Sequence, residues 1–154
     1  MNRLCVGICS VAGTFLFVAI LTGQNGGVKK AVDIQVQAVD GRNGKPLEKQ
    51  HLLVFTGISS DAVKSHAEHT GLTTDKDGLG TLTIYPAETQ WIQVWADGRV
   101  LCQSDPNQST FSVDIIISKG LTTPNTCSRI ARVPAPGRFV VFARPARLTE
   151  KIKQ

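Results

Sequence analysis

Residues 32–47 read VDIQVQAVDGRNGKPL, and this stretch decides the fold class. Its first half alternates apolar and polar side chains with a period of two, which predicts a β-strand, Val32–Val39, with one buried face. Its second half contains two glycines and a proline, which end the strand and predict a turn. Comparable segments follow along the chain, so the sequence predicts an all-β protein.

Turn residues separate the strands that we expect. Turn chemistry is supplied by Asn43-Gly44, Asp77-Gly78, Asp97-Gly98 and Asp105-Pro106. After the first strand, the expected strands are His51–Thr56, Gly80–Tyr85, Trp91–Ala96, Val100–Gln103, Phe111–Ile117 and Phe139–Phe142. Asp97-Gly98 is typical of a two-residue hairpin loop. The sequence therefore predicts one antiparallel β-sandwich over residues 32–145, with residues 59–69 as a partly helical loop.

The N-terminus is expected to direct the chain out of the cell. Arg3 precedes an uncharged apolar stretch, Val6–Leu21, which suits a signal peptide or, if it is not cleaved, an N-terminal anchor. We assign residues 1–23 to this segment, 24–31 to a polar linker and 146–154 to a basic C-terminal tail. The protein is then periplasmic or extracellular, and meets the membrane only through an uncleaved N-terminal segment.

The chain carries a formal net charge of +5, and the excess lies toward its C-terminus. The basic residues there are Arg129, Arg132, Arg138, Arg144, Arg147, Lys151 and Lys153. Such a concentration could contact a partner with anionic groups, but a solvated basic surface is the simpler explanation. The export segment and the lack of interleaved aromatic residues argue against nucleic acid. An unknown protein or a cell-envelope polymer is the expected partner.

Two cysteines, Cys102 and Cys127, lie beyond the N-terminal segment. In an exported protein an isolated pair of cysteines favours a disulfide. The alternative is a pair of free thiols or a metal site, and a metal site needs further ligands at short spacing, which the sequence lacks around them.

Two segments resemble a known family. Residues 36–47, VQAVDGRNGKPL, and 74–84, TDKDGLGTLTI, resemble the carboxypeptidase regulatory-like domain of exported bacterial proteins. In that family a D-x-x-x-G-x-P-L turn ends the first strand, and a T-D-x-D-G turn opens a later one. Gly44 and Gly78 would supply the positive φ of these turns, and Asp40 and Asp75 would cap them. The resemblance covers about residues 32–96 and implies a prealbumin-like, Greek-key sandwich.

Trp91 and Trp95 are candidates for a ligand platform. On an alternating strand both rings share a face with Gln93, and paired tryptophans on an exposed face can stack against sugar rings. The alternative is that both rings belong to the core.

His66 and His69 are weak candidates for a metal site. Two histidines on one helical turn could share Zn²⁺ or Cu²⁺, but solvated surface histidines have the same spacing. No G-x-S-x-G motif, no paired carboxylates and no cofactor motif are present. We therefore expect a non-catalytic binding or structural module at the cell envelope, without a cofactor. The alternatives are a carbohydrate-binding domain or a small metal-dependent enzyme.

Overall fold

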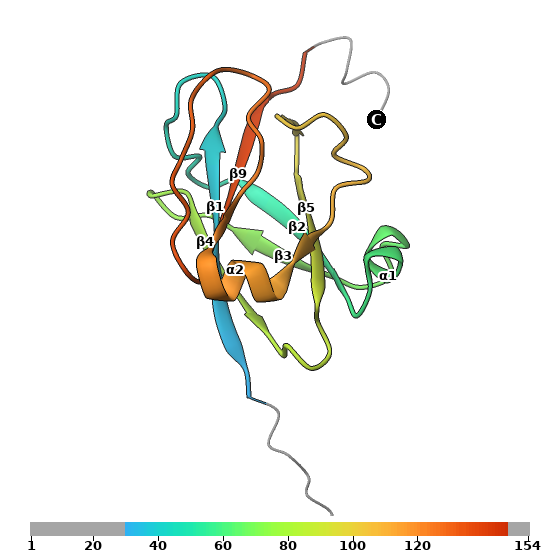
Figure 1. Ribbon diagram of the computed structural model, residues 1–154. Helices are drawn as coiled ribbons and strands as arrows, with labels where there is room; N and C mark the ends of the chain where they lie inside the picture. Colours follow the sequence, from blue (N-terminus) through green and yellow to red (C-terminus); the bar gives the residue numbers. More distant parts are fainter. Residues whose placement is uncertain (1–29, 148–154) are drawn as a thin grey trace, which may run out of the picture.

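The computed structural model describes residues 30–147, which form two packed β-sheets (Figure 1). In chain order the elements are β1 (Val32–Asp40), β2 (His51–Gly57), α1 (Ser60–Lys64), β3 (His69–Thr73), β4 (Leu79–Ile84), β5 (Trp91–Ala96), β6 (Arg99–Leu101), β7 (Phe111–Ser112), α2 (Val113–Lys119), β8 (Leu121–Thr122) and β9 (Arg138–Pro145). Sheet A has the strand order β4-β1-β9-β6, with β8 beside β9, and sheet B has the order β3-β2-β5-β7. The predicted all-β sandwich is confirmed at this level.

Two expected segments fall outside the described residues. They are the N-terminal segment, 1–23, and the basic tail from residue 148 onward. Most of the linker also lies outside, since the described chain begins at Lys30. Within residues 30–147, no helix has the length and apolar character needed to cross a membrane.

Strand β1 shows the predicted alternation. Ile34, Val36 and Ala38 are buried in the core between the sheets, whereas Asp33 and Gln35 are exposed. The turns at its end and before β4 use the expected glycines, because Gly44 and Gly78 both have φ of 73°. This conformation is strained for any residue with a Cβ atom.

The prediction of a wholly antiparallel sandwich was wrong. β1 pairs antiparallel with β4, opposite Gly80 at Val36, but it pairs parallel with β9, opposite Phe139 at the same residue. β8 also runs parallel to β9. Parallel neighbours require a long connection, and residues 123–137 carry the chain from the end of β8 back to the start of β9.

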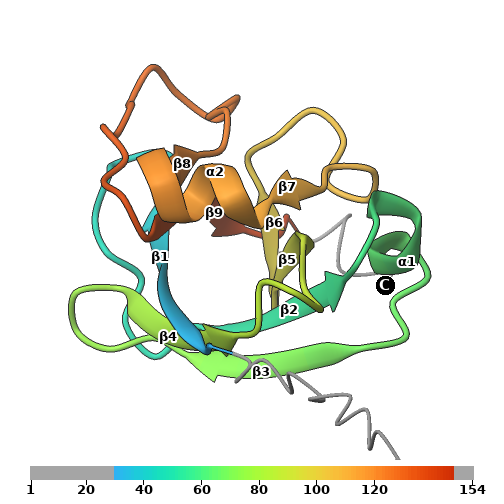
Figure 2. The ribbon, with the colours of Figure 1, turned by 60° about the horizontal axis from the view of Figure 1, so that its bottom comes forward.

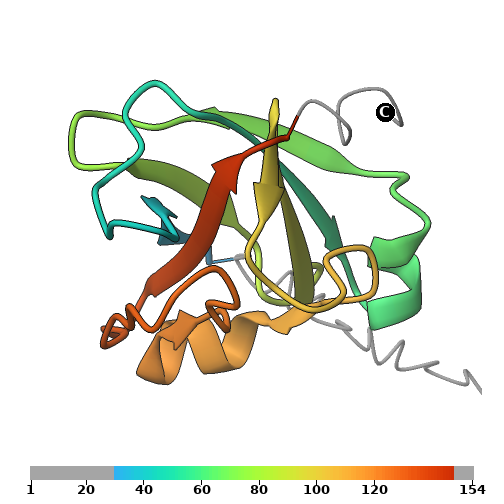
Figure 3. The same cartoon turned by 90° about the horizontal axis from the view of Figure 1, so that it is seen from above.

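Strand β9 is buried on both faces. Phe139, Val141 and Ala143 belong to the core between the sheets. Val140 and Phe142 point the other way, into a second apolar cluster with Val39, Cys102, Cys127 and Ile130. The strand lies between β1 and β6 in sheet A, so its backbone is hydrogen-bonded along both edges (Figure 3).

The strand expected over Phe111–Ile117 was wrong, because only Phe111–Ser112 is extended and α2 follows at once. In a helix, residues three or four apart lie on the same face. Val113 and Ile116 therefore both enter the core, whereas Ile115 is 45% exposed. Figure 2 shows α2 between β7 and β8, where it carries the chain from sheet B to sheet A.

The Asp97-Gly98 turn is present, but it does not close a hairpin. β5 ends at Ala96 and β6 begins at Arg99, as expected for a two-residue loop, and Gly98 has φ of 64°. β5 pairs with β2 and β7, however, and β6 pairs with β9. The turn therefore passes the chain from one sheet to the other.

The segment 59–69 contains a short helix, as predicted, and the beginning of an additional strand. Ser59 caps α1 by accepting a hydrogen bond from the Ala62 N–H at 3.1 Å. α1 contacts β2 and β5 beside sheet B (Figure 1). β3 then begins at His69 and forms the edge of that sheet.

Candidate functional site

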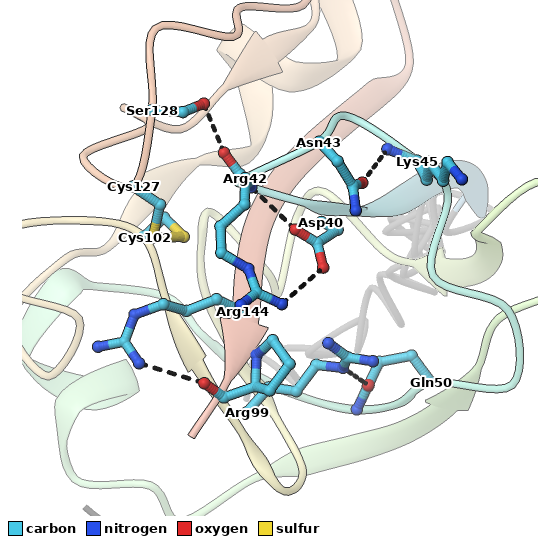
Figure 4. A network of polar contacts seen from close by, with 12 residues as sticks. Asp40, Arg42, Asn43, Lys45, Gln50, Arg99, Cys102, Cys127, Ser128 and Arg144 are labelled. Atoms are coloured by element: carbon cyan, nitrogen blue, oxygen red, sulfur yellow. Dashed lines mark hydrogen bonds and ion pairs between the residues drawn. A yellow bond between two sulfur atoms is a disulfide. The ribbon is translucent and has the colours of Figure 1, made fainter. Parts of the chain in front are cut away.

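The topology gathers arginines at one end of sheet A. Because β1 and β9 are parallel, their carboxyl ends meet there, with Asp40 opposite Ala143. β6 begins at the same end, with Val100 opposite Arg144. Figure 4 shows Arg42, Arg99 and Arg144 close together at this end.

The turn after β1 is organised around Asp40, which is 7% exposed. Its carboxylate accepts a hydrogen bond from the Arg42 N–H at 2.8 Å and lies 3.6 Å from the Arg42 guanidinium (Figure 4). Burial alone would raise the pKa of Asp40. The backbone and side-chain hydrogen bonds of Arg42, its charge and the Asn43 N–H outweigh burial and lower this pKa below its ordinary value. The carboxylate therefore stays ionised, and the positive charge of Arg42 balances its negative charge within the protein.

Asn125 fixes the loop that follows β8 against this turn. Its amide nitrogen lies within hydrogen-bonding distance of the carbonyls of Gly41 and Ile130, both at 2.9 Å, and of Ser128 Oγ at 3.2 Å. Its oxygen accepts the Cys127 N–H at 3.1 Å. Ser128 Oγ also donates to the Gly41 carbonyl at 2.6 Å (Figure 4). The Asn125 side chain thus connects the turn after β1 with the loop after β8, two segments that are far apart in the sequence.

The predicted disulfide is present, and it holds the same loop. Cys102 and Cys127 are bonded, and they lie 25 positions apart in the sequence. Gly41 lies directly under the bridge, because a Cβ atom there would stand 2.4 Å from Cys102 Sγ. A glycine is therefore required for the turn and the bridge to approach so closely.

The loop and the turn together display a group of cationic side chains, which we call the cationic end. Arg132 donates a hydrogen bond to the Gly44 carbonyl at 2.6 Å, so the two segments are in direct contact. The side chain of Arg42 is 57% exposed. The cationic end comprises Arg42, Lys45, Arg129, Arg132 and Arg144. Its members come from three separate segments of the chain.

Not every basic residue of the C-terminal excess belongs to this end. Arg138 begins β9, at the opposite end of the strand from Arg144, and donates to Gln35 Oε1 at 3.0 Å. Arg147 is exposed just beyond β9, and Lys151 and Lys153 lie outside the described residues. The fold therefore adds Arg42 and Lys45 to the group and separates Arg138 from it.

The two tryptophans lie on the outer face of sheet B and not in the core. Ile92, Val94 and Ala96 fill the core from the inner face of β5, whereas Trp91 and Trp95 are half-buried on the other face. Each ring lines a different hollow. Gln93, between them, is completely buried.

Gln93 is a polar centre that sequence reasoning missed. Its amide nitrogen donates to the carbonyls of Pro106 and Asn107, at 2.8 and 3.0 Å, so its oxygen must be the acceptor toward His66 Nε2 at 2.9 Å. His66 therefore carries a proton on Nε2. His66, two residues after the end of α1, also has φ of 56°, which is in the left-handed region. An apolar strand interrupted by one glutamine was the available signal.

The two histidines lie on either side of Phe55. The ring of Phe55 is 4.5 Å from that of His66 and 5.6 Å from that of His69, and Trp95 completes the aromatic cluster. Across residues 30–147, no group of three or more His, Cys, Asp or Glu side chains is arranged to hold a metal ion. His66 therefore combines a ring contact with its hydrogen bond to Gln93, and His69 contributes a ring contact.

Comparisons with protein-family models, with curated proteins and with solved structures found no match to this chain. The function is therefore argued from the geometry of the described residues.

Proposed function

We propose that this protein is a non-catalytic binding module of the cell envelope, and that its cationic end binds an anionic envelope polymer. The observation that carries the proposal is the assembly of Arg42, Lys45, Arg129, Arg132 and Arg144 on segments locked together by Asn125 and a disulfide. Export to a periplasmic or extracellular location, and a prealbumin-like architecture, are parts of the same proposal. The disulfide supports export, because such bonds persist in oxidising compartments.

The charge balance of the cationic end supports an anionic partner. Asp40, the carboxylate that lies 3.6 Å from the Arg42 guanidinium, is buried and engaged by Arg42, so it offers little charge to solvent. Guanidinium groups form paired, charge-assisted hydrogen bonds with carboxylate and phosphate groups. A repeating anionic polymer would meet several of these cations at once. The binding energy would then come from many weak contacts and would fall with salt concentration.

The rigidity of this end supports binding rather than a passive solvated surface. A surface made only for solubility needs no fixed geometry, whereas here the loop is held by a partly buried asparagine and a covalent bridge. Because the backbone that carries these side chains is already fixed, less conformational entropy is lost when a partner binds.

The test is a pair of charge reversals that change net charge equally. Arg129→Glu with Arg132→Glu alters the cationic end, whereas Lys30→Glu with Lys119→Glu alters the start of β1 and the end of α2. Binding of the purified protein to a soluble polyanion, such as polygalacturonate or polyphosphate, is measured at several salt concentrations. Each cation near an anionic surface contributes about 1 kcal/mol, so the first pair should weaken binding at least about tenfold.

Equal weakening by both pairs would show that only net charge matters, and the proposed site would be wrong. The same conclusion would follow if neither polyanion bound the unaltered protein at low salt. Circular dichroism and intact-mass measurement confirm that each variant keeps its strands and its disulfide.

A further inference from the structure

A hollow beside Trp95 contains none of the residues of the cationic end and has no role in the proposed function. It has a volume of about 290 Å³, near the lower end for small-ligand pockets. Trp95 forms one wall, and the Pro106–Asn107 edge of the loop before β7 forms another. The remaining lining is Ala96, Arg99, Val100 and Leu101.

Two hydrogen-bond donors of this lining have no acceptor. Trp95 Nε1 and Arg99 Nη1 are both buried, and neither has a partner within the described structure. Buried donors are normally paired, and an unpaired one costs free energy. Two unpaired donors on residues of one hollow indicate that an acceptor completes them.

The guanidinium of Arg99 is held in a fixed orientation. Its Nε donates to Gln50 Oε1 at 2.6 Å (Figure 4). Gln50 is itself anchored, because its amide nitrogen donates to the carbonyls of His51 and Asp97 at 2.9 and 2.8 Å. Gln50 is thus a positioning residue, and Arg99 keeps Nη1 available for another group.

The missing acceptor is an anion. An arginine keeps its charge at any physiological pH, and none of the ion pairs formed by described residues involves Arg99. The lining contains no carboxylate. Apart from the amide of Asn107, the other side chains around the hollow are an indole ring and aliphatic groups, which favour an apolar or ring-shaped body.

We propose that this hollow binds a small organic carboxylate, with the carboxylate on Arg99 Nη1 and Trp95 Nε1 and the body of the ligand against the Trp95 ring. The shared chemistry is one carboxylate attached to a ring. A sugar acid and an aromatic acid both present it, and the experiment below distinguishes them.

The ligand reaches the two donors when the Pro106–Asn107 edge moves outward. Both donor atoms are covered in the present structure, so one wall has to yield. That edge is tied to sheet B by the Gln93 amide, which donates to both of its carbonyls. Breaking these two bonds opens the hollow without disturbing the inner face of β5.

The chain contains only two tryptophans, so one substitution isolates the signal of the proposed site. Trp91→Phe leaves Trp95 as the sole indole, and its emission reports contact with a ligand. This variant is titrated at constant ionic strength with glucuronate against glucose, and with benzoate against benzyl alcohol. Titration to about 10 mM covers the range expected for ligands of this size.

We expect at least one acid to change the Trp95 emission and to bind at least about tenfold more tightly than its neutral counterpart. A response to glucuronate indicates a sugar ring as the body of the ligand, and a response to benzoate indicates an aromatic ring. Arg99→Met in the Trp91→Phe background should weaken binding about 10- to 100-fold, since a charge-assisted hydrogen bond is lost. Arg138→Met removes an arginine from the opposite end of sheet A and should leave the affinity unchanged.

The proposal is overturned if neither acid alters the emission, or if acid and neutral compound bind equally well. It is also overturned if Arg99→Met and Arg138→Met have the same affinity. Should Arg99→Met fail to fold, Arg99→Lys keeps the charge but loses the fixed donor pair, and it must also bind more weakly. The proposed polymer site has its own variants, Arg129→Glu and Arg132→Glu, so either site can fail without the other.

Discussion

Replacing Asn125 with alanine should be one of the most damaging polar substitutions in the domain. The side chain contacts the carbonyls of Gly41 and Ile130 and accepts the Cys127 N–H, at 2.9, 2.9 and 3.1 Å. Each such bond contributes about 1 kcal/mol net, and partners left unpaired in a partly buried site add to the loss. We therefore expect Asn125→Ala to reduce the free energy of unfolding by about 3 kcal/mol. For a domain of this size the melting temperature should fall by about 10 °C.

Asn43→Ala is the matched control for this measurement. Asn43 is exposed and its side chain accepts only the Lys45 N–H, at 2.9 Å, so its removal should cost about 0.5 kcal/mol. Both variants are compared with the unaltered protein by urea unfolding under conditions that keep the disulfide. If the two asparagine variants lose the same stability, the disulfide alone fixes the loop and the role given to Asn125 is wrong.

Three further substitutions test other parts of the structure. Ile116→Ala should cost about 2–5 kcal/mol, whereas Ile115→Ala, at a side chain 45% exposed, should stay within about 0.5 kcal/mol; the reverse order in urea unfolding would restore the strand first expected there. Reduction of Cys102–Cys127 should cost about 3.5 kcal/mol, and an unchanged melting temperature in reductant would show that the bridge constrains little. The lowered pKa of Asp40 stabilises the fold above the ordinary carboxyl pKa, and this stability should disappear as the pH falls through the lowered value; Asp40→Asn should remove that part of the pH profile, and an unchanged profile would contradict it.

The local pattern located those strands that have one face in the core. β1 and β4 were found because their buried residues recur with a period of two, and the turns between strands because Gly44, Gly78 and Gly98 require positive φ. Such signals lie within a few residues of the structure that they specify.

The pattern failed where distant packing decides the conformation. Residues 113–119 contain three consecutive isoleucines, which prefer strands, yet the segment is a helix. The opposing local signals were present but weaker: Asp114 in the first turn, Lys119 in the last and Gly120 after it, with φ of 75°. The parallel direction of β9 had no local signal, because it depends on the path of residues 121–137.

The candidate site was predictable in composition and not in geometry. The excess of arginine toward the C-terminus was visible, and so was the cysteine pair. The contact between Arg132 and Gly44 joins positions 88 residues apart, and no local pattern reports such a contact. Gln93 and Gln50 gain their roles from bonds to other segments of the chain, so each looks like an ordinary polar residue in the sequence.

The central position of β9 constrains the order in which the domain can fold. Gln35 and Arg138, which are 103 residues apart, are bonded across the boundary between β1 and β9. Until residues 138–145 are in place, one edge of β1 has no partner strand. β6 also lacks the strand with which it pairs. Sheet B can therefore form early, because its strands all lie between residues 51 and 112, whereas sheet A is completed only when β9 is added. Contacts of such long sequence separation slow folding, so closure of sheet A is the expected rate-limiting event.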